Sequence, residues 1–160
     1  MNFYLKQKFF SFNDRFTIYD ENGDDRYYVE GEIFSWGKKL HFFDLNGDEL
    51  AFISQKVFSF LPKYYISMGG RDVAEVVKEF TFFYPSYGVS LSDGSYWNIE
   101  GDFFDHEYTI GDSSRMIATI SKEWFTWGDA YCVSVADGVD PALALSIVLI
   151  IDACLDAQRD

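Results

Sequence analysis

Two histidines and two cysteines are the side chains of this sequence best suited to proton transfer or nucleophilic attack. His41 stands in an apolar, strand-like run and His106 in a polar stretch near a turn. Hydrolytic catalysis needs a nucleophile beside a base that a third group orients. Neither Cys132 nor Cys154 has a histidine nearby in sequence, Gly-x-Ser-x-Gly does not occur, and only the fold decides which groups meet in space. We therefore expect no enzymatic activity, and both cysteines are interpreted as small buried apolar residues that stay reduced.

Two acidic turns carry the oxygen ligands that hard cations prefer. Residues 20–25 read Asp-Glu-Asn-Gly-Asp-Asp, and residues 44–49 read Asp-Leu-Asn-Gly-Asp-Glu. An EF-hand calcium loop has glycine at its sixth position and glutamate at its twelfth, whereas each segment here has glycine at its fourth. We interpret both as solvated acidic hairpin tips, with calcium binding as the alternative. Two histidines and two cysteines do not suggest a zinc site or a disulfide framework, so no metal or other cofactor is predicted.

Basic side chains are unevenly distributed along the chain. Residues 38–78 contain six Lys or Arg and five Asp or Glu, a net charge of +1, which leaves −14 for the remainder. An anionic headgroup would bind the least acidic face, because each nearby Lys or Arg contributes about 1 kcal/mol. The glycine motifs of phosphate-binding loops are absent from the sequence. Ordinary surface lysines among interleaved acids are the alternative. The candidate anionic-ligand residues are Lys38, Lys39, Lys56, Lys63 and Arg71.

Length, charge and composition set the frame in which these residues stand. With 160 residues the chain is expected to form one domain, residues 1–160. Its net charge of −13 argues against nucleic acid as a partner, because phosphate contacts need a basic surface. Hydrophobic residues make up 48% of the chain, as in globular proteins. The aromatic share of 20% predicts many strands and a large core, since aromatic residues favour strands and fill cores.

A degenerate repeat is the strongest pattern in the sequence. Each copy begins with a charged or amide pair and continues through apolar positions to a Pro or Asp turn and an aromatic-x-Ile/Val ending. The four copies are 7–18, 55–66, 78–89 and 122–133. Their spacings of 48, 23 and 44 residues are unequal, whereas an open solenoid wants a fixed period. Unequal hairpins that close into a barrel are therefore favoured.

Turn signals divide the chain into short strands. Asn-Gly and Asp-Gly pairs favour the tight hairpin turns in which both central residues have positive φ. Twelve strands are predicted, and a closed antiparallel barrel would leave none of them with a free edge. Their expected bounds are 2–10, 14–20, 26–33, 39–44, 49–57, 63–68, 71–80, 86–91, 96–103, 105–110, 115–124 and 130–135.

The last part of the chain breaks this rhythm and predicts a helix over residues 139–157, after strands within 1–136. Asp140 can cap the helix, and Pro141 suits its first position. The following residues are almost wholly apolar up to Asp152, so the helix must be buried on every side. A barrel that encloses the helix meets this need, and Asp152 and Asp156 would then mark where it emerges into water. Packing on an open sheet is the alternative.

Several segments together resemble a known family. They are residues 4–8, 16–20, 28–32 and 118–124 and the helix 140–156. The chain resembles the LURP-one-related proteins, a branch of the tubby C-terminal-like fold, over essentially its whole length. This resemblance implies a mostly β (α+β) fold, a twelve-stranded antiparallel closed β-barrel around a central apolar C-terminal helix. It implies no catalytic motif, whereas two distant relatives, the tubby proteins and the phospholipid scramblases, are linked to lipids.

Two functions from different classes follow from these observations. The first is a non-enzymatic intracellular structural or interaction module for a protein or peptide partner. The second is weak binding of anionic, phosphoinositide-like phospholipid headgroups at a membrane surface. Charged residues close behind Met1 argue against a signal peptide, and the apolar run 142–151 is shorter than the roughly 20 residues of a membrane span. A cytoplasmic protein that does not span the membrane is therefore expected.

Overall fold

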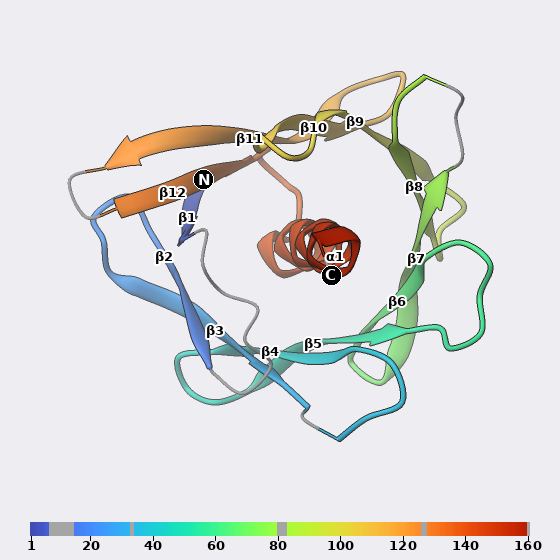
Figure 1. Cartoon of the computed structure of the whole chain (residues 1–160). Coiled ribbons are helices and arrows are strands. Elements are labelled where there is room, and N and C mark those ends of the chain that lie inside the picture. Colours follow the sequence, from blue (N-terminus) through green and yellow to red (C-terminus); the bar gives the residue numbers. More distant parts are fainter. Residues whose placement is uncertain (7–14, 33, 80–82, 126–127, 160) are drawn as a thin grey trace.

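Twelve strands enclose one helix in the computed structural model, which describes residues 1–6, 15–32, 34–79, 83–125 and 128–159 (Figure 1). Each strand pairs antiparallel with the next, and β12 pairs with β1 to close the barrel. The strands are β1 (Asn2–Lys6), β2 (Phe16–Tyr19), β3 (Asp25–Gly31), β4 (Lys39–Asp44), β5 (Glu49–Gln55), β6 (Lys63–Met68), β7 (Arg71–Glu79), β8 (Ser86–Leu91), β9 (Tyr96–Asp102), β10 (Glu107–Gly111), β11 (Met116–Phe125) and β12 (Gly128–Val135). The predicted fold class and the number of strands are confirmed.

Alternation of side chains along each strand places the core inside the barrel. In β4, Leu40 and Phe42 point inward and are buried, whereas His41 and Phe43 lie on the outer face and are half-buried. The register continues into β5, where Leu40 lies opposite Ile53, which is also buried. This period of two is what a sheet with one buried face requires.

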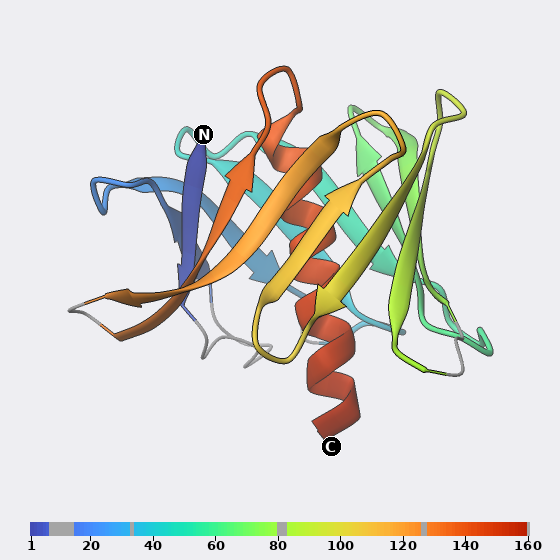
Figure 2. The same ribbon diagram turned by 90° about the horizontal axis from the view of Figure 1, so that it is seen from above.

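The helix α1 (Pro141–Arg159) fills the barrel along its axis (Figure 2). It begins two residues later than predicted, because Asp140 is its N-cap: the Asp140 Oδ1 accepts a hydrogen bond from the backbone N–H of Ala142 at 2.9 Å. The side chains from Ala144 to Ile151 are buried on all sides. By length and composition residues 141–158 could also cross a membrane, but most of this stretch is buried inside the barrel.

The predicted exit point of the helix needs a correction. Asp152 does not emerge into water, because its side chain is only 13% exposed and both carboxylate oxygens are bound. Oδ1 lies 3.2 Å from Nε2 of His106, and Oδ2 accepts a hydrogen bond from the hydroxyl of Tyr131. A carboxylate can lie this deep only with such partners. Beyond it Asp156 is half-buried and Ala157 is exposed, so the helix leaves the barrel about one turn later than expected.

The two ends of the barrel receive different connections. Odd-numbered strands run toward the end where α1 leaves, here called the helix-exit end, and even-numbered strands run back (Figure 2). The second repeat copy, 55–66, spans one hairpin at the helix-exit end, between β5 and β6. Most of the first copy, 7–18, lies outside the described residues, as do 80–82 of the third and 126–127 of the fourth.

The opposite end, here called the acidic end, is built from tight polar turns. Its described connections contain eight acidic side chains and one arginine: Asp20, Glu21, Asp24, Asp48, Asp93, Asp112, Asp137, Asp140 and Arg115. In the turn after β2, the Asp20 Oδ1 accepts hydrogen bonds from the backbone N–H groups of Asn22 and Asp24. Asp44 does the same in the turn after β4. These carboxylates thereby stabilise the turns themselves.

Candidate functional site

Large aromatic side chains project into solvent from four hairpins of the helix-exit end, β3–β4, β5–β6, β7–β8 and β9–β10. The β3–β4 connection exposes 99% of Phe34 and 79% of Trp36, and the β5–β6 connection exposes 93% of Phe58 and 100% of Phe60. Three further exposed aromatics lie on the next two hairpins: Phe83, Tyr84 and Phe104. Such gathering of apolar groups at one end is typical of an interaction surface.

This distribution corrects the expectation that aromatic residues serve strands and core. Phe3, Phe42 and Tyr64 do point into the core. Phe58 and Phe60, by contrast, lie in the β5–β6 connection, within the second repeat copy and just before Pro62. Their place between the predicted strands 49–57 and 63–68 is confirmed, but they were not predicted as functional residues because aromatic residues were assigned to strands and core in general. The available signal was their alternation with Ser59 next to a proline turn, where no strand could continue.

The β3–β4 and β5–β6 hairpins are locked against each other. The backbone N–H of Lys38 donates to the Gln55 side-chain oxygen at 3.0 Å, and the Gln55 N–H donates to the Lys38 carbonyl at 2.8 Å. Gly37 has φ of 76°, and a Cβ there would lie 3.2 Å from both the Gln55 carbonyl oxygen and a Val57 methyl. Only glycine permits this approach at low cost. The two hairpins therefore present their side chains as one surface.

We call this surface the aromatic–lysine rim. It consists of Phe34, Trp36, Lys38, Lys39, Lys56, Phe58, Phe60 and Lys63. Residues 32–39 and 55–63, which contain it, hold four lysines and Glu32, a net charge of +3, in a chain whose total is −13. The rim is therefore the electrostatic opposite of the acidic end.

The four lysines of the rim differ in their surroundings. Lys56 is exposed and Lys39 is half-buried, and within the described part of the chain neither ammonium has a hydrogen bond or ion pair. Lys63 forms an ion pair with Glu75, Nζ to Oε1 at 3.2 Å. The Lys38 ammonium points back toward the barrel axis and donates to the carbonyl of Ala153 on α1 at 3.1 Å. Lys39 and Lys56 are thus the two best placed to meet an anion.

Arg71 does not join the other candidate anionic-ligand residues. It is the first residue of β7, directly after the Gly69-Gly70 turn at the acidic end. The lysines begin or precede strands at the helix-exit end, so a barrel length separates them from Arg71. The five residues predicted as one anionic-ligand site therefore reduce to the four lysines.

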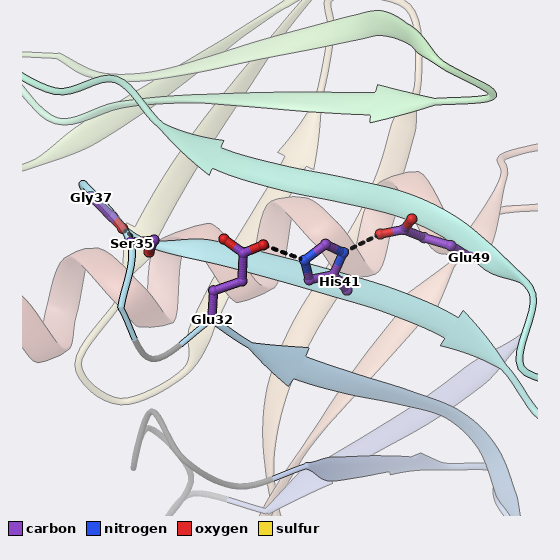
Figure 3. A network of polar contacts seen from close by, with 5 residues as sticks. All are labelled: Glu32, Ser35, Gly37, His41 and Glu49. Atoms are coloured by element: carbon purple, nitrogen blue, oxygen red, sulfur yellow. Dashed lines mark hydrogen bonds and ion pairs between the residues drawn. The ribbon is translucent and has the colours of Figure 1, made fainter.

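His41 lies outside the barrel, in a line of polar contacts on β4 (Figure 3). Its Nε2 lies 3.0 Å from Oε1 of Glu32, and its Nδ1 contacts Oε1 of Glu49. Partial burial alone would lower the pKa of His41, but the hydrogen bonds to the two carboxylates outweigh burial and raise it. This bridge ties three neighbouring segments together and leaves neither ring nitrogen open to a substrate.

His106 belongs to a second, buried cluster. It adopts a positive φ of 54° in the β9–β10 connection and stacks on the ring of Tyr131 at 4.2 Å between centroids. Burial first, and then the charge of Asp152, raise the pKa of Tyr131 well above its usual value. This cluster anchors α1 to β12. The Nδ1 of His106 and the hydroxyl of Tyr108 are buried without a protein partner among the described residues.

Both cysteines are buried and unpaired with each other, as predicted. Burial raises the pKa of the Cys132 thiol, and it raises that of Cys154 to about 11. Their side-chain hydrogen-bond partners are Tyr4 and Tyr87, and not a histidine. Within the described ranges, no group of three or more His, Cys, Asp or Glu side chains is arranged to hold a metal ion.

Comparisons with known proteins agree on the family and the fold. A Bacillus subtilis protein, the uncharacterized YxjI, is 38% identical over 157 residues, which cover 98% of this chain and 95% of YxjI. A crystal structure of an Arabidopsis thaliana protein, AT5G01750, superposes with a TM-score of 0.70 over 96% of this chain and 90% of the plant protein, at 17% identity. The sequence model of the LURP-one-related family matches residues 1–152. This chain therefore belongs to the LURP-one-related family.

Proposed function

We propose that this protein is a non-catalytic intracellular binding module whose helix-exit end is the contact surface. The observation that carries the proposal is the set of almost fully exposed aromatic side chains on the hairpins of that end. Exposed aromatics cost solubility, and in stable interfaces aromatic side chains supply much of the binding free energy. The barrel is then the rigid support that holds these hairpins in place.

The surroundings of the candidate catalytic residues support a role without chemistry. Both ring nitrogens of His41 are bound to carboxylates, and His106 is paired with Asp152 beside Tyr131. The two thiols are buried, and their raised pKa values keep them protonated near neutral pH. A nucleophile beside an oriented base, which hydrolysis needs, is not formed by these four residues.

Two classes of partner fit a contact surface of this kind. A protein or peptide partner would bury the aromatic side chains in an interface. The strongly acidic remainder of the chain would keep the protein in solution. Anionic phospholipid is the second candidate, and the lysines among the exposed aromatics favour it. Both candidates use the same end of the barrel, so one experiment tests the surface first.

Photo-crosslinking in intact cells tests the surface without assuming a partner. We would introduce p-benzoylphenylalanine in place of Phe60 at the helix-exit end, and in place of Leu45, which is 56% exposed at the acidic end, as the matched control. Adducts are expected from position 60 and not from position 45. Their mass distinguishes protein from lipid. Equal adduct formation at the two positions, or none at position 60, would overturn the proposed contact surface.

A further inference from the structure

We propose that the aromatic–lysine rim docks onto the surface of an anionic lipid bilayer, with Phe34, Trp36, Phe58 and Phe60 inserted at the level of the headgroups. This inference rests on the proposed role of the helix-exit end as a contact surface, and it names the partner. The ligand is the bilayer interface as a whole, and not one headgroup in a pocket.

The side chains of the rim are layered along the barrel axis as an interfacial contact requires. The four aromatic rings belong to the two connections beyond the ends of β3 and β5. Lys39 is the first residue of β4 and Lys56 directly follows the end of β5, so both lie one step back from these tips. Rings that enter the interface would therefore place the ammonium groups near the lipid phosphates. Aromatic side chains with flanking lysines are the usual composition of membrane-surface contacts.

The charge distribution would orient the molecule on an anionic surface. The rim segments carry a net charge of +3, and the connections at the far end carry eight acidic side chains against Arg115. An anionic bilayer attracts the first and repels the second. Asp102 and Asp105 lie across the barrel, at the β9–β10 side of the helix-exit end, so an anionic surface would attract the β4 to β6 side of this end more strongly.

The shape of the surface favours a bilayer over a folded partner. Phe58 and Phe60 are 93% and 100% exposed, so they project as separate tips and do not line a groove. A cavity at the same end is lined by residues of β7 to β10 and the connections between them, and not by residues of the rim. A folded partner needs complementary hollows for such tips, whereas a fluid bilayer accommodates any shape.

The backbone of Phe58 supplies a further observation. Phe58 has φ of 61°, in the left-handed region that bulky residues avoid. The side chain gains no burial in return, since it is 93% exposed. Strained residues persist where the surrounding structure imposes them, and they gather at ligand contacts. Here the strained conformation directs a phenyl ring away from the barrel.

Vesicle binding tests the inference directly. The probes are vesicles of phosphatidylcholine alone and vesicles with about 30% phosphatidylglycerol, at low and high salt. Wild-type protein should sediment with the anionic vesicles, and less so at high salt. The variant Phe34→Ser, Trp36→Ser, Phe58→Ser, Phe60→Ser should partition at least about tenfold more weakly, because the inserted apolar area is lost. Lys39→Glu, Lys56→Glu should bind more weakly and lose most of its salt dependence.

Two controls separate insertion from general effects. Leu45→Ser, Met116→Ser removes exposed apolar side chains from the acidic end and should bind like wild type. Lipids brominated along the acyl chain should quench the fluorescence of Trp36, and Trp36→Phe should lose this quenching while it still sediments. Phe58→Ser alone is the fallback if the fourfold variant does not fold.

The inference is overturned if wild-type protein does not bind anionic vesicles at low salt, or if the aromatic variants bind as wild type does. Equal loss in the acidic-end control would overturn it too. A protein adduct from position 60 without vesicle binding would refute the lipid inference and leave the proposed contact surface intact. If position 60 formed no adduct and the protein did not bind vesicles, the proposed function would be refuted as well.

Discussion

The Lys38 ammonium donates a hydrogen bond to the carbonyl oxygen of Ala153, 3.1 Å away and 115 residues later in the chain. It connects the β3–β4 hairpin to the helix inside the barrel. Ala153 is buried in the last third of α1, where it lies beside the end of the barrel. The aromatic–lysine rim is thus attached to the core of the protein, so Lys38 has a structural role that an exposed surface lysine would not have.

Lys38→Met should lower the free energy of unfolding by about 1 kcal/mol, because a part-buried hydrogen bond from a charged donor is lost. Lys56→Met is the matched control and should stay within about 0.5 kcal/mol of wild type, because Lys56 is exposed and exposed charges contribute little. Urea denaturation of the two variants measures the difference. Equal stabilities for the two variants would refute the structural role of Lys38.

Val148→Asp should unfold the domain. Val148 is fully buried in the middle of α1, and an unpaired carboxylate there costs several kcal/mol, comparable with the whole stability of a small domain. Ala157→Asp adds the same charge at the exposed end of the helix and should fold normally. Circular dichroism melting measures both. A soluble Val148→Asp protein with wild-type melting would contradict an enclosed helix.

His41 should make stability depend on pH. Its pKa is raised in the folded protein by Glu32 and Glu49, so protonated His41 stabilises the fold. This contribution is fully present below the unfolded pKa of about 6.5 and is lost as pH rises through the raised folded pKa. His41→Gln should therefore be destabilised relative to wild type near pH 5 and much less near pH 9. A difference that is constant across this range would exclude the effect.

Chelation of divalent cations should leave the melting temperature unchanged. Asp20 and Asp44 each accept two backbone hydrogen bonds at Oδ1 within their own turns, which occupies one of the two carboxylate oxygens of each residue. A tightly bound ion would stabilise the fold by linkage, so its removal would lower the melting temperature. Thermal melts with and without EDTA, and with added calcium, measure this. A drop of several degrees would show that a cation is bound, and these acidic turns would be the first places to look for it.

Local patterns in the sequence were sufficient for the barrel and its helix. Alternation such as Leu40 and Phe42 inward against His41 outward follows from the two-residue period of a strand. Asp140 and Pro141 indicated where the helix begins, and the helix had to be enclosed completely because its surface is apolar on all sides. The separation of Arg71 from the lysines also followed in principle, because connections after even-numbered strands of an antiparallel barrel all lie at one end.

The candidate site, in contrast, was decided by tertiary structure. Whether an aromatic residue of the repeat is buried or exposed depends on whether it lies in a strand or in a hairpin connection. The repeat pattern in the sequence is the same for the exposed Phe58 and for an aromatic residue of the core. Lys38 reaches Ala153, and Asp152 finds His106 and Tyr131, only because the barrel closes around the helix. Strand and helix periods are properties of neighbouring residues, so the sequence alone determined the fold. The rim is formed by hairpins from separate parts of the chain, so only the closed barrel could assemble it.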